Sequence, residues 1–170
     1  MEPRHVLAIQ ALFNLVSYAI VLRAFVWPRL RGLPRVAALQ PLVAFHFVRT
    51  LGLFALYPAM TSERVAASRW AHHVAAGDAL TVALAWAAVL ALRTKPRLGV
   101  ALAWAMNTVG TLDVLNAGRN AAAERIVDGP IGPHALVLAF GVPALVVTHV
   151  AIYGVLLRRE PVRTLAPPPG

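Results

Sequence analysis

Five long apolar stretches, separated by short polar links, divide the sequence. Each is about 20 residues long, which is the length an α-helix needs to cross a hydrocarbon layer of ~30 Å. We therefore predict an all-α fold, an integral membrane bundle of five transmembrane helices that contacts the lipid bilayer. The predicted helices cover approximately residues 5–27, 36–58, 70–92, 98–117 and 134–157. They form a single transmembrane domain over 1–159, and the proline-rich residues 160–170 are predicted to be a disordered cytoplasmic tail.

The first helix carries a polar stripe and a proline near its end. Gln10, Asn14 and Ser17 follow an i, i+4, i+7 spacing and so share one face of the helix. Because polar groups avoid lipid, that face is expected to turn towards the other helices. Pro28 is expected to end the helix. A signal peptide has a shorter apolar region, so we predict that this segment is retained.

The distribution of Lys and Arg predicts the orientation of the bundle. The first and third links and the tail are strongly basic, whereas the basic residues of the N-terminus and the other links are partly offset by acids. Because cytoplasmic loops carry the excess of positive charge, we predict that the N-terminus is outside and the C-terminus is cytoplasmic. The predicted location is the inner membrane of a bacterium.

Ionisable and amide side chains lie inside four of the apolar stretches, and the predicted orientation gives their depths. An outer layer is expected to contain Arg49, Asp78 and Asp113. Each ionised group inside a bilayer needs a partner, so these three either pin helices together or form the floor of an outward-facing polar pocket. Asn107 is expected near the middle, and we include it in the candidate pocket.

His46 and His149 are expected to lie in the deeper layer with Asn107. Two imidazoles from facing helices can ligate a haem iron or, with a carboxylate, another metal. They can also relay protons, or simply hydrogen-bond to Asn107, Thr148 or a backbone carbonyl. The other internal histidines, His72, His73 and His134, are expected at the outer interface.

Composition narrows the class of protein. Hydrophobic residues make up 59% of the 170 residues and charged residues 14%, so no large soluble domain is present. The net charge of +9 comes from arginines at the ends of apolar runs, which anchor helices and do not indicate nucleic-acid binding. The absence of cysteine excludes disulfides, thiolate metal sites and cysteine nucleophiles. No motif of a zinc protease, serine hydrolase or phosphate loop occurs.

Several short motifs together resemble a family of uncharacterised small bacterial multi-pass membrane proteins. The motifs are His46-x-x-Arg49 with Gly52 and Pro58, Gly77-Asp78, Asn107-x-x-Gly110-x-x-Asp113 and Thr148-His149. The resemblance covers roughly residues 40–157, whereas the first helix and the long link 118–133 fit it less well. It implies the bundle and the polar positions, and it implies no reaction.

Three classes of function fit these patterns. The first is a non-catalytic protein that binds a small molecule or cofactor, or that serves as an accessory subunit of a larger membrane complex of photosynthetic or respiratory type. The second is a membrane-embedded enzyme for a lipid-like or quinone-like substrate, with Asp78 or Asp113 as general acid or base and His46 or His149 as its partner. The third is a small proton-coupled transporter, which the lack of repeated halves disfavours.

Overall fold

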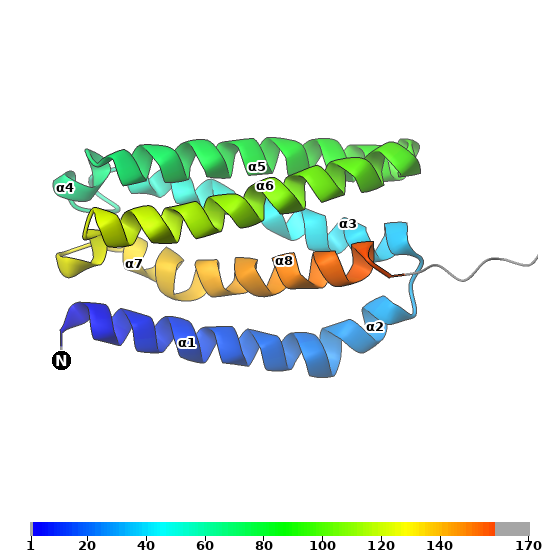
Figure 1. The fold of residues 1–170 in the computed structure, drawn as a ribbon, viewed down its shortest axis with the longest axis horizontal. Helices are drawn as coiled ribbons and strands as arrows, with labels where there is room; N and C mark the ends of the chain where they lie inside the picture. Colours follow the sequence, from blue (N-terminus) through cyan, green and yellow to red (C-terminus); the bar gives the residue numbers. More distant parts are fainter. Residues whose placement is uncertain (1, 159–170) are drawn as a thin grey trace, which may run out of the picture.

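The computed structural model describes residues 2–158, so the predicted disordered tail 160–170 lies outside the described residues. The predicted all-α class is confirmed. Within the described part, five helices are long and apolar enough to cross a membrane, and the protein is by this measure a multi-pass membrane protein. The five spans are Arg4–Arg31, Arg35–Leu56, Arg69–Thr94, Pro96–Ala123 and His134–Leu156. They run side by side along the long axis of the molecule (Figure 1).

The first span contains α1 (Pro3–Val21), the π-helical segment η1 (Leu22–Val26) and α2 (Trp27–Arg31). The prediction that Pro28 ends this helix was wrong, because the chain continues helically to Arg31. Proline lacks an N–H, and it is tolerated at the start of a helix, where that N–H has no intrahelical partner. Pro28 occupies such a position in α2, directly after the wider π turn.

The predicted polar stripe of α1 does not turn towards the bundle as a unit. Gln10 and Ser17 are exposed, and the Ser17 hydroxyl donates to the carbonyl of Phe13 within its own helix at 2.8 Å. Asn14 does face the bundle, and its Nδ2 donates to the carbonyl of Ala139 at 2.9 Å. That carbonyl has no α-helical donor, because the residue four positions later is Pro143. Asn14 therefore satisfies a backbone group that lipid would leave unpaired.

The second span changes its helix type halfway. It consists of α3 (Arg35–Phe45) and the 3-10 helix η2 (His46–Leu56), and the short α4 (Glu63–Ala66) follows after a loop. Tyr57 is extended rather than helical, because a residue that precedes proline is disfavoured in the α conformation. The predicted helix 36–58 therefore ends two residues early, at Leu56.

The third and fourth spans form a hairpin of two long helices, α5 (Arg69–Thr94) and α6 (Pro96–Ala123). Both exceed the predicted ranges, and α6 ends at Ala123 rather than at residue 117. Trp70 joins the far ends of the hairpin: its indole N–H donates to the Ala117 carbonyl at 2.9 Å, and its backbone N–H donates to Oε2 of Glu124 at 3.2 Å. These contacts keep residues 118–123 helical, where the sequence suggested a link.

The fifth span contains α7 (His134–Leu136), the π-helical η4 (Val137–Gly141) and α8 (Val142–Leu156). It lies between α1 on one side and the hairpin of α5 and α6 on the other (Figure 1). The main apolar core lies where α3, α5, α6 and α8 meet, and it includes Leu39, Met106 and Ile152. A smaller core of α5 and loop residues around Trp70 and Ile126 lies nearer the end that holds α4 and α7.

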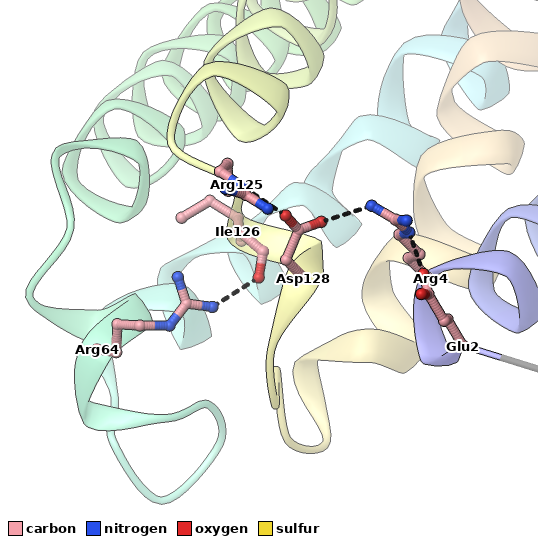
Figure 2. Close-up of polar contacts among 6 residues, drawn as sticks. All are labelled: Glu2, Arg4, Arg64, Arg125, Ile126 and Asp128. Atoms are coloured by element: carbon pink, nitrogen blue, oxygen red, sulfur yellow. Dashed lines mark hydrogen bonds and ion pairs between the residues drawn. The ribbon is translucent and has the colours of Figure 1, made fainter.

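An ion-pair cluster joins the start of α1 to the loop that follows α6, which contains the 3-10 turn η3 (Ile126–Asp128). Figure 2 shows Asp128 between Arg125, at 2.6 Å, and Arg4, at 3.4 Å. The hydrogen bond from Arg125, with Arg4 nearby, holds the pKa of the Asp128 carboxyl below its usual range. In the same view Arg64 donates to the carbonyl of Ile126 at 2.8 Å. The cluster fastens the peripheral helix α1 at this end of the bundle.

Candidate functional site

The 3-10 geometry of η2 places a line of small and polar residues towards the bundle. Side chains three positions apart eclipse one another in such a helix, and the buried residues of η2 are His46, Arg49, Gly52 and Ala55. Thr50, which an α-helix would place on the same face, is exposed and donates to the carbonyl of Phe47 at 3.1 Å. The change of helix type therefore decides which polar residues enter the interior.

Arg49 is the centre of a charged group that joins three helices. Its Nε lies 2.6 Å from Oδ1 of Asp78 on α5, and its second terminal nitrogen forms an ion pair with Asp113 on α6. The side chain of Arg49 is 1% exposed, whereas those of Asp78 and Asp113 are 10% and 13% exposed. The guanidinium is thus covered, and the two carboxylates form the accessible side of the group. We call these three residues the charged floor.

A hydrogen-bond pair from α6 and α8 supports the charged floor from the interior. Nδ1 of His149 lies 2.8 Å from Oδ1 of Asn107, and Nδ2 of Asn107 donates to the His149 carbonyl at 3.2 Å. Nε2 of His149 lies 3.4 Å from a terminal nitrogen of Arg49. An arginine nitrogen can only donate, so Nε2 accepts and Nδ1 carries the proton. His149 is therefore a neutral ring. Asn107 orients it, and its Nε2 contacts the terminal nitrogen of Arg49 that does not pair with Asp113.

His46 lies beside this pair without a hydrogen bond of its own. It is fully buried, and its ring centre is 4.3 Å from that of His149, with the planes tilted by 45°. Neither ring nitrogen has a partner among the described residues. The two predicted layers thus meet in one network, because the Arg49–His149 contact joins the outer group to the deeper one.

The ring geometry does not fit a haem that both histidines ligate. A metal ion lies about 2 Å from each ligand nitrogen, so two imidazoles on opposite sides of an iron have ring centres roughly 6 Å apart, with the porphyrin between them. The rings here are closer, and both nitrogens of His149 are engaged. Within residues 2–158, no group of three or more His, Cys, Asp or Glu side chains could hold a metal ion.

Three glycines make room for the polar side chains. A Cβ atom on Gly52 would overlap the carboxylate of Asp78, and one on Gly77 would overlap that of Asp113. A Cβ on Gly110 would lie 2.7 Å from Cε1 of His149. Each glycine therefore lets a buried polar group approach a neighbouring backbone. The sequence motifs contained all three glycines, although their spacing did not show what they would contact.

A cavity of about 140 Å³ adjoins the charged floor, between η2, α5, α6 and the segment of η4 and α8. Arg49, Asp78 and Asp113 line one part of it, and its walls are mainly apolar. Trp70 and His134 line another part, and their rings meet edge to face at 5.9 Å. The apolar wall residues include Val48, Leu51, Val74, Val114, Leu138 and Leu145.

The cavity differs from the pocket that the polar residues suggested. Asn107 does not line it, since it lies behind His149, and the walls are apolar rather than polar. His134, expected at the outer interface, is 1% exposed and packs against Trp70. Sequence reasoning missed both rings as wall residues. The signal that could have found them is weak: each is an aromatic or imidazole side chain near the start of a helix that faces the same end of the bundle.

A comparison with known protein families identifies the family of this chain. The sequence matches a family described as a domain of unknown function, DUF8737, over residues 6–157. The chain belongs to this family. The match covers most of the chain and includes all five apolar helices, so the resemblance to an uncharacterised membrane-protein family is confirmed at that level. Neither a curated protein nor a solved structure matches the chain.

Membership of the DUF8737 family extends to the first helix and to residues 118–133, which fitted the resemblance less well. Both segments contribute to the described structure, because the ion pairs of Arg4 and Asp128 hold them together. The family description names no activity, so membership assigns no chemistry to the cavity.

Proposed function

We propose that the protein is a non-catalytic membrane protein that binds a small, mainly apolar molecule with one polar group. The cavity that combines apolar walls with the charged floor supports this proposal. Ligand sites of proteins are typically apolar pockets with a few convergent polar groups. Such a molecule would lie against the walls and direct its polar group towards Asp78 and Asp113.

The volume of the cavity limits the size of the group that it can hold. An engineered apolar cavity of about 150 Å³ in another protein binds benzene, and the cavity here has a volume of about 140 Å³. A single ring or a short aliphatic chain fits this space. A larger molecule would extend out of it, past half-exposed wall residues such as Val48 and Leu51.

The distribution of cations supports an orientation with the cavity on the outer side of a bacterial inner membrane. Arg31, Arg93, Lys95 and Arg97 lie at the end of the bundle opposite α4 and α7. Positive charge is enriched on the cytoplasmic side. In this orientation the N-terminus is outside, and the cavity lies in the outer half of the membrane.

Filling the cavity tests the proposal. Gly141 lines the cavity, and a Cβ there would meet only Cγ1 of Val137 within 4 Å, at 3.5 Å. Gly141→Leu should therefore fold and occupy the space, as should Ala117→Leu from the opposite wall. Val150→Phe adds volume to a lipid-facing position of α8 that is 62% exposed and serves as the matched control.

The measurement is the small-molecule content of the purified protein, determined by solvent extraction and mass spectrometry, together with the rise in unfolding temperature on adding ethylbenzene. We expect a stoichiometric molecule, or stabilisation by ethylbenzene, in wild type and Val150→Phe and in neither filled variant. If all four proteins behave alike, the cavity is not a binding site.

A further inference from the structure

We propose that the molecule bound in the cavity carries an amine or another cationic group, which pairs with the carboxylates of Asp78 and Asp113. This inference rests on the proposed function and adds to it the chemical class of the ligand. Three observations support it: which charges are accessible, how they balance, and which protein groups lie against the guanidinium.

The accessible part of the charged floor is anionic. The side chains of Asp78 and Asp113 retain 10% and 13% exposure, whereas the guanidinium between them is covered and its side chain is 1% exposed. All three residues line the cavity, and the two carboxylate side chains are the more accessible ones to a ligand that reaches the floor. Carboxylates only accept hydrogen bonds when ionised, so the complementary group is a donor.

Each of the three nitrogens of Arg49 already lies against a protein group. Its Nε faces Asp78, one terminal nitrogen pairs with Asp113, and the other contacts Nε2 of His149. An anionic ligand would have to share the guanidinium with these partners and would lie beside two carboxylates, which repel it. The arrangement therefore selects against carboxylates and phosphates as the polar group of the ligand.

With both carboxyl groups ionised, the charged floor carries a net negative charge. One guanidinium faces two carboxylates, and Arg49 is the only arginine or lysine among the described residues that line the cavity. The neighbouring histidines do not supply the missing positive charge: Nε2 of His149 accepts from Arg49, and neither nitrogen of His46 has an acceptor against it in the described part of the chain. An unpaired charge at bilayer depth is costly. An ammonium group on the ligand would restore neutrality.

Four probes of similar size separate the possibilities: benzylamine, benzyl alcohol, ethylbenzene and benzoate. Each is titrated against the full-length protein in lipid nanodiscs at pH 7, and binding is followed by the rise in unfolding temperature. We expect benzylamine to bind about tenfold or more tightly than ethylbenzene, because a hydrogen bond between charged groups is added. Benzoate should be the weakest of the four.

Asp113→Asn and Asp78→Asn test the role of the carboxylates. Each variant leaves one guanidinium opposite one carboxylate, so the floor stays paired while its excess negative charge is removed. We expect either variant to lose the preference for benzylamine and to retain binding of ethylbenzene. The wild-type probe series is informative by itself should both variants fail to fold.

The outcomes distinguish this inference from the function on which it rests. If benzyl alcohol or ethylbenzene binds as tightly as benzylamine, and Gly141→Leu abolishes their binding, the cavity is a binding site and the cationic class is wrong. If benzylamine binds equally well to wild type and Gly141→Leu, the amine is not in the cavity, and the cationic class is wrong. The proposed function fails as well if ethylbenzene also binds equally well to both proteins.

Discussion

At the scale of single residues, one arginine organises the interior. Arg49 pairs with carboxylates from two helices and contacts a histidine from a third. These contacts differ from surface ion pairs, because the surroundings offer little water to replace a lost partner. Removing the arginine should therefore destabilise the protein much more than removing one of the two carboxylates.

Arg49→Leu should destabilise the protein strongly. It leaves the carboxylates of Asp78 and Asp113 buried without a cation, and breaking a buried pair in this way typically costs about 3–5 kcal/mol. Asp113→Asn, which keeps one ion pair, should cost much less. Unfolding in detergent, followed by circular dichroism against temperature, measures both. An Arg49→Leu protein as stable as Asp113→Asn would contradict the assignment of Arg49 as the central cation.

Gly52→Ala should also destabilise the protein, although it changes no charge. The added methyl group would overlap the carboxylate of Asp78 and force the ion pair apart, and overpacking of this kind costs about 1–3 kcal/mol. Gly118→Ala is the matched control, since a Cβ there meets nothing within 4 Å. The same unfolding measurement applies. Equal stability of the two alanine variants would show that η2 can shift freely away from α5.

At the scale of elements, segments that are not α-helical flank the cavity. The 3-10 helix η2 forms one wall, and the π-helical η4 with the start of α8 forms another. Irregular helical backbone inside a membrane needs protein partners for its unpaired groups. Asn14 supplies one such partner, for the carbonyl of Ala139. The position of α1 is thus coupled to the wall of the cavity.

The attachment of α1 at its N-terminal end should weaken in acid. The pKa of Asp128 is lowered in the folded protein by the hydrogen bond from Arg125 and by Arg4. A group whose pKa is lowered on folding stabilises the protein above its unfolded pKa, and this contribution disappears as the pH falls through the folded pKa. The contribution of Asp128 should therefore begin to fall near its ordinary pKa of 3.8 and disappear as the pH drops through its lowered pKa.

A comparison of wild type with Asp128→Asn isolates this contribution, because all other acids titrate in both proteins. Unfolding temperatures measured from pH 6 down to pH 3, at low salt, should show wild type above the variant at pH 6 and the two converging below about pH 3.8. A gap between the two proteins that stays constant over the whole range would show that the ion pairs of Figure 2 do not contribute.

At the scale of the whole molecule, the two ends of the bundle differ in charge and structure. One end holds α4, α7 and the ion-pair cluster, and the other holds the short basic turns between the spans (Figure 1). At the basic end Arg158 donates to the carbonyl of Leu30 in the last turn of the first span, at 3.1 Å, and to that of Leu33 in the link that follows, at 2.9 Å.

The orientation can be tested with single cysteines, because the chain has none of its own. Ala59 and Gly32 are exposed and lie in links at opposite ends of the bundle. A membrane-impermeant maleimide added to intact cells should label Ala59→Cys, and it should label Gly32→Cys only after the membrane is permeabilised. The reverse pattern would place the cavity on the cytoplasmic side.

The amino-acid sequence by itself determined the class of the fold and the polar residues that meet inside it. Apolar runs of spanning length can only be satisfied by helices in a bilayer, and the few ionisable residues within them need partners. Hydropathy and depth alone therefore predict that one layer of the bundle contains Arg49, Asp78 and Asp113.

Only the tertiary structure decided which contacts the polar residues make and which of them line the cavity. The 3-10 register of η2 excludes Thr50 from the interior, and the hydrogen bonds of Asn107 and Arg49 engage both nitrogens of His149. The apolar cavity, with Trp70 and His134 in its wall, arises from segments far apart in the chain. Depth follows from position along a helix, whereas the direction of a side chain depends on helix type and on packing between helices. Helix type and packing between helices both depend on contacts with residues that are distant in the sequence.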